Sequence, residues 1–81
     1  MAIVNKQTGD PYEKLANAVI AQAAEDYRAA LKKIKAHPKN KDVINEALRI
    51  ERFFRSGWYQ TLTSVDGERL IRRLQAEIRS S

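Results

Sequence analysis

Apolar residues recur at helical intervals along the first half of the chain. They are spaced alternately four and three residues apart, in a heptad-like stripe made of Ala16, Ile20, Ala23, Tyr27, Ala30 and Ile34. Small and large side chains alternate in this stripe, so a second helix can approach closely at the alanines. The pattern predicts a long helix over residues 11–36, which ends at His37-Pro38 because the residue before a proline disfavours helical conformation.

The residues just before this stripe carry the signals of a helix start. Asp10 can accept the free N–H groups of the first turn, and Pro11 fits the first helical position because its missing N–H costs nothing there. Glu13 suits the positive end of the helix dipole. We therefore expect a flexible arm over residues 1–9 and a single helical domain over residues 10–81.

A second stripe with the same spacing consists of Val43, Ala47, Ile50 and Phe54. It predicts a helix over residues 39–56, with Asn40 as a candidate cap. Gly57 follows this helix and is expected to close it in the left-handed conformation. With the glycine at the bend, Trp58 should pack back on Phe53.

A short turn or helical piece is expected over residues 57–63, before a third helix over residues 65–79. Thr63 and Asp66 have the spacing of a capping pair, and Gly67 weakens the first turn slightly while it permits close packing. These segments predict an all-α fold, a small three-helix bundle. The first helix is too long for either later helix to cover alone. Either the later helices cover different parts of it, or a second copy of the chain completes the bundle.

Composition narrows the class of protein. The 81 residues include no cysteine, which excludes a disulfide framework and a thiolate zinc site. No apolar run reaches the length of a membrane span, and the first ten residues lack the apolar block of a signal peptide. We therefore expect a cytoplasmic protein that has no membrane partner.

The sequence contains no motif of a catalytic or cofactor site. The single histidine, His37, precedes a proline at a helix end, and the acids Asp66 and Glu68 lie at a helix start, where the dipole favours them. Spacings typical of metal ligands, activated nucleophiles and phosphate-binding loops do not occur. We expect a non-enzymatic protein without a cofactor or a metal.

The basic balance of the chain, a net charge of +5, favours anionic partners. The densest cationic run lies between Asp26 and Asp42 and consists of Arg28, Lys32, Lys33, Lys35, Lys39 and Lys41. Its first four members lie near the end of a helix, where the dipole favours cations. Lys39 and Lys41 lie near the start of the next helix, where the dipole disfavours them. Anion binding and ordinary helix-end electrostatics are both open interpretations of the run.

A second basic set lies on the second predicted helix. Arg49 can pair with Glu46 three residues earlier, whereas Arg52 has no acid within one helical turn. Arg52 also borders an aromatic corner that consists of Phe53, Phe54, Trp58 and Tyr59. Such an arginine suits a planar anion or a base through bidentate and stacking contacts, or it lies over the tryptophan ring. We include Arg49 and Arg52 in the predicted anion-binding surface.

Small uncharacterised proteins of prophages and mobile elements of Gram-positive bacteria resemble this chain in two stretches, KLANAVIAQAAEDYRAALKKIK and IERFFRSGWYQTLTSVDGERLIRRLQAEI. The resemblance covers most of the chain and implies a mobile-element setting in a bacterial host cell. A further pattern is similar to the helical hairpin of phage cyclic-nucleotide sponges: Leu48, Phe53, Ser56, Leu62, Leu70 and Leu74. This similarity implies oligomers that sequester a nucleotide signal, with Tyr12 and Arg28 as ligand contacts.

Three hypotheses for function follow. The first is a helical phage or mobile-element protein that binds an anionic partner, above all nucleic acid, through its basic face. The second is a counter-defence protein that inhibits a host immune protein or sequesters a cyclic nucleotide. The third is a helical assembly module, a homo-oligomer that pairs through its first helix.

Overall fold

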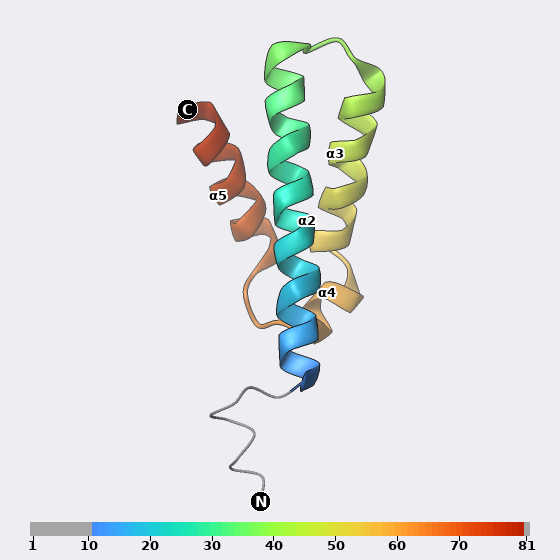
Figure 1. The fold of residues 1–81 in the computed structure, drawn as a ribbon, viewed down its shortest axis with the longest axis vertical. Coiled ribbons are helices and arrows are strands. Elements are labelled where there is room, and N and C mark those ends of the chain that lie inside the picture. Colours follow the sequence, from blue (N-terminus) through green and yellow to red (C-terminus); the bar gives the residue numbers. More distant parts are fainter. Residues whose placement is uncertain (1–10, 81) are drawn as a thin grey trace, which may run out of the picture.

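The computed structural model describes residues 11–80, in which four helices pack against one another in an all-α bundle (Figure 1). The helices are α2 (Pro11–Ala36), α3 (Lys41–Phe54), α4 (Gly57–Leu62) and α5 (Gly67–Ser80). The predicted arm over residues 1–9 and the predicted cap Asp10 lie outside the described residues. In the described part, no helix is both long enough and apolar enough to cross a membrane.

The long helix α2 forms the axis of the bundle. Figure 1 shows α3 and α5 on either side of its C-terminal half and α4 beside its N-terminal half, and α2 packs against all three. The later helices thus cover different parts of α2. Every residue of the predicted stripe is buried or half-buried within the single chain. Self-association therefore does not need this stripe and stays a prediction that would use another face of α2.

Apolar and aromatic side chains from all four helices form one core. Its most deeply buried members are Tyr27, Phe54, Tyr59, Ile71 and Leu74. The rings of Tyr27 and Phe54 meet edge to face, with centroids 6.0 Å apart, which joins α2 to α3. Each large side chain buried in this way stabilises the fold by about 1.5–3 kcal/mol.

The start of α3 confirms the cap that was predicted from sequence. The Asn40 side chain accepts hydrogen bonds from the N–H groups of Asp42 and Val43, so the helix begins at Lys41 instead of residue 39. At its other end, the prediction for Gly57 is wrong. Gly57 does not adopt the left-handed conformation; it is the first residue of α4.

Ser56 explains why the bend takes this form. Its hydroxyl accepts a hydrogen bond from the N–H of Tyr59, 3.1 Å away, which caps α4 and starts a new helix immediately after α3. The predicted contact across the bend is nevertheless confirmed. The rings of Phe53 and Trp58 lie 5.3 Å apart between centroids.

The last helix starts two residues later than predicted because Asp66 caps it. The Asp66 carboxylate accepts a hydrogen bond from the N–H of Arg69, whereas the Thr63 hydroxyl accepts one from Val65 inside the preceding loop. The close packing expected at Gly67 is confirmed. A Cβ atom at this position would lie 1.9 Å from the backbone oxygen of Phe54, so only glycine lets α5 meet the end of α3.

Candidate nucleic-acid interface

The connection between α2 and α3 gathers the basic run at one end of the bundle, at the green turn in Figure 1. Lys32 and Lys33 lie in the last turns of α2, Lys39 lies in the connection, and Lys41 is the first residue of α3. All four side chains are exposed, and they make no ion pair or hydrogen bond with any described residue. We call these four lysines the basic end.

Three other cations of the predicted site already have ion-pair or hydrogen-bond partners within the bundle. The guanidinium of Arg28 bridges Glu77 of α5 at 2.9 Å and Glu25 of α2 at 2.8 Å. The ammonium of Lys35 donates a hydrogen bond to the backbone oxygen of Ile78 at 3.0 Å, which satisfies a carbonyl near the end of α5. These contacts join α2 to α5, so Arg28 and Lys35 serve the fold.

The third engaged cation is Arg49, which pairs with Glu46 one turn earlier on α3, as the spacing predicted. Arg52 has no ion-pair partner among the described residues. It belongs to the outer face of α3, opposite the buried stripe, where exposed residues recur at spacings of four, three and four: Lys41, Asn45, Leu48 and Arg52. This face continues the basic end along the helix.

The structure does not bring Tyr12 and Arg28 into one pocket of a single chain. They lie sixteen positions apart on the same helix, since 28 − 12 = 16. That separation corresponds to roughly 24 Å along the helix axis. A shared ligand would therefore need residues from a second chain.

The aromatic corner is chiefly a part of the core. Phe54 and Tyr59 are almost fully buried and meet edge to face with centroids 5.7 Å apart, and Phe53 contacts both of them. Only Trp58 presents a large surface, with an exposed fraction of 59%. The corner thus closes α3 onto α4 and leaves one ring available at the surface.

The sequence analysis did not predict a polar contact in the core that joins α2, α3 and α5 through hydrogen bonds. The hydroxyl of Tyr27 on α2 donates to the Glu51 carboxylate on α3 at 2.5 Å and accepts from the Gln75 amide on α5 at 3.1 Å. Burial, followed by the hydrogen bond to Glu51, raises the pKa of Tyr27 above its ordinary value of 10.0. A signal was present in the sequence, because Glu51 adjoins the buried position Ile50 in the apolar stripe.

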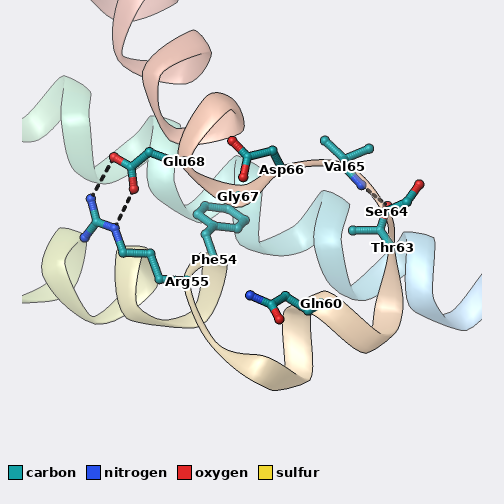
Figure 2. A pocket seen from close by; sticks show the side chains of 9 residues that line it. All are labelled: Phe54, Arg55, Gln60, Thr63, Ser64, Val65, Asp66, Gly67 and Glu68. Atoms are coloured by element: carbon teal, nitrogen blue, oxygen red, sulfur yellow. Dashed lines mark hydrogen bonds and ion pairs between the residues drawn. The ribbon is translucent and has the colours of Figure 1, made fainter.

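A polar hollow of about 470 Å³ lies where α3, α4 and the loop before α5 meet (Figure 2). Its charged side chains are all committed: Arg55 pairs with Glu68 at 2.8 Å and with Glu51 at 3.3 Å, and Asp66 caps α5. The bond to Arg55 lowers the pKa of Glu68 below its ordinary value of 4.5. We therefore interpret the hollow as a structural corner, whose charged side chains stabilise the fold.

The basic end differs from that hollow because its charges are free to meet a ligand. Exposed lysine ammonium groups suit phosphate groups spaced along a backbone better than a small buried anion. The described residues contain no cluster of three or more metal-binding side chains. Comparison of the chain with family models, curated proteins and solved structures finds no match, so function has to be inferred from this surface chemistry.

Proposed function

We propose that the chain is a non-enzymatic binding protein that holds nucleic acid on the basic end and the adjoining outer face of α3. One observation carries the proposal: the basic end and Arg52 have no ionic partner within the described part of the bundle. Phosphates would supply those partners, and release of counterions from the nucleic acid would drive the association.

The position of two of these lysines argues against a purely structural role. Lys39 and Lys41 lie beside the N-terminus of α3, where the helix dipole is positive and cations are disfavoured by about 0.3–1 kcal/mol each. These two charges therefore do not stabilise α3. A phosphate at the same place interacts favourably with both the lysines and the helix end.

The outer face of α3 adds side chains that can contact bases. Arg52 and Asn45 are exposed on the same side of the helix as Lys41. Arginine reads guanine and asparagine reads adenine through paired hydrogen bonds, while the lysines hold the backbone. A protein of this kind fits the mobile-element setting that the sequence resemblance implies.

The first test is fluorescence anisotropy of a labelled random duplex, titrated with the protein. Four lysine–phosphate contacts predict that affinity falls roughly 100-fold between about 50 and 200 mM salt. A small nucleotide ligand would instead show a shallow salt dependence. A fall of less than about tenfold, or no binding at either salt concentration, would overturn the proposal for nucleic acid.

A charge-reversal pair locates the surface. Lys39→Glu combined with Lys41→Glu should weaken duplex binding at least about tenfold at low salt, because two phosphate contacts become repulsive. The matched control is Lys14→Glu combined with Arg69→Glu. It changes net charge by the same amount and also replaces exposed cations near helix N-termini, but away from the basic end. Equal loss in both variants would show that only net charge matters.

A further inference from the structure

Two neighbouring hollows lie between α2 and the α3–α4 segment, and we call them together the groove. The lower part, nearer the N-terminus of α2, has a volume of about 430 Å³ and is mostly apolar. It is lined by Val19 and Ala23 of α2 and by Phe53 and Trp58. The upper part, also of about 430 Å³, lies between Lys33 and the start of α3. Asp26 lines both parts, so the two hollows meet at this residue.

The exposed apolar surface in the lower part has no structural use in the bundle. Trp58, which lines this part, is 59% exposed although it is the largest side chain of the chain. Exposed apolar surface of this kind marks interaction sites in soluble proteins. Tryptophan is also the residue most enriched among those that dominate binding energy.

The upper part of the groove is anionic, in contrast to the chain as a whole. It is lined by three carboxylates, Asp26, Asp42 and Glu46, and by one cation, Lys33. Glu46 is paired with Arg49, but Asp26 and Asp42 have no ion-pair partner among the described residues. The unpaired acids of the upper part therefore favour a cationic segment.

The length of the two hollows together suits a short helix. Along α2 the groove extends from Ala18 to Lys33, which corresponds to roughly 22 Å, or about four helical turns of a bound segment. Small residues on the α2 wall allow the close approach that helix packing needs: Ala18, Ala23, Ala29 and Ala30. Helix-in-groove recognition uses apolar anchors at helical spacing on one face of the ligand.

We propose that this groove binds a basic amphipathic helix of a partner protein. Apolar side chains of that helix pack against Trp58 and Val19, and its lysine or arginine residues pair with Asp26 and Asp42. The local acids Asp26 and Asp42, and not the net charge of the chain, favour this occupant, because a cationic segment complements them. The inference does not rest on the nucleic-acid proposal, although Lys33 of the basic end also lines the upper part of the groove.

A displayed library of helical peptides about four turns long tests the proposal. Leucines occupy one face of each peptide, all other positions are random, and tryptophan is excluded so that Trp58 is the only tryptophan reporter. Selection against the full chain should enrich peptides that carry Lys or Arg in one half. Their binding should shift the emission of Trp58 to shorter wavelength, because the ring becomes buried.

Paired variants tie the binding to the groove. Asp26→Asn combined with Asp42→Asn should weaken the selected peptides about tenfold by removing both cation partners. The matched control, Glu13→Gln combined with Glu25→Gln, removes one first-turn acid and one mid-helix acid outside the groove and should leave affinity unchanged. Ala18→Lys fills the apolar part without disturbing α2, because residue 18 is exposed, and should abolish binding.

Four results of the binding experiments would each overturn the proposal. They are the absence of any selected binder, selected peptides without basic enrichment, equal losses in the acid-removal pair and its control, and binding that survives Ala18→Lys. A sedimentation mass of a dimer, with Trp58 protected from quenching by iodide, would also overturn it, because a second copy would then be the occupant.

Discussion

Both the α3–α4–α5 corner and the basic end carry several charges, yet the bundle treats those charges differently. At the corner, Arg55, Glu68 and Asp66 each have a partner, and a glycine lets two backbones touch (Figure 2). At the basic end, four lysines have no partner among the described residues, and two of them oppose a helix dipole. The comparison separates charges that are paired within the fold from charges that have no partner there.

The largest expected effect lies at the corner. In Gly67→Ala the new Cβ would lie 1.9 Å from the Phe54 oxygen, so α5 has to move away from α3. We expect the free energy of unfolding to fall by about 3 kcal/mol or more, measured by urea denaturation followed by circular dichroism. The control is Gly57→Ala, where nothing lies within 4 Å of the added atom. It should change stability by less than about 1 kcal/mol, toward greater stability.

A smaller loss is expected from the polar contact in the core. Tyr27→Phe leaves the Glu51 carboxylate and the Gln75 amide without their shared hydroxyl, which should cost about 1–3 kcal/mol of unfolding free energy. Tyr59→Phe is the matched control, because the Tyr59 hydroxyl is buried without a hydrogen-bond partner among the described residues. Its removal should be neutral or stabilising. Equal losses in the two variants would mean that the hydroxyl contacts of Tyr27 carry no energy.

The contrast between the two regions also explains which features of the fold could be predicted from the sequence. The apolar stripes predicted α2 and α3 and placed Tyr27 and Phe54 in the core, because burial follows helical periodicity closely. The bend after α3 was predicted wrongly because two local signals compete there. Gly57 favours a left-handed end, but the Ser56 hydroxyl caps α4 instead.

The candidate site was less predictable, because pairing depends on contacts between residues far apart in the sequence. Arg28 and Lys35 look equivalent to Lys32 and Lys33 in the sequence, yet the first two form polar bonds to α5 and the latter two form no ion pair or hydrogen bond with a described residue. The difference depends on which side of α2 each residue occupies. The sequence does not show which side α5 packs against. The groove was missed for the same reason, since Trp58 and Asp26 are far apart in the sequence.

A substitution at the basic end should change the free energy of unfolding in the opposite direction from a substitution at the corner. Lys41→Glu removes an unfavourable charge from the N-terminus of α3 and should raise the free energy of unfolding by about 0.3–1 kcal/mol. The control is Lys33→Glu, in the last turn of α2, which should lower it by a similar amount because cations are favoured there. Both variants should weaken duplex binding. Lys41→Glu should therefore raise stability while it lowers affinity for the duplex. A stability loss in Lys41→Glu would give this lysine a structural role.

The smallest expected effect is the response of the two inter-helix ion pairs to acid. Hydrogen bonds from Arg55 and Arg28 lower the pKa values of Glu68 and Glu77 below 4.5 in the folded chain. The folded state therefore binds these protons less readily than the unfolded state. The stabilisation is fully present above about pH 4.5 and is lost as pH falls through the lowered values.

Thermal unfolding from pH 7 down to pH 3 should therefore show a midpoint that decreases only below about pH 4.5. In Arg55→Gln the decrease should be shallower, because Glu68 then titrates near its ordinary pKa in both states. Lys39→Gln, at the basic end, should leave the acid response unchanged, because no carboxylate pairs with Lys39. If Lys39→Gln flattened the curve as much as Arg55→Gln, the charges of the two regions would not be used differently, and the basis for assigning the lysines to a ligand would be lost.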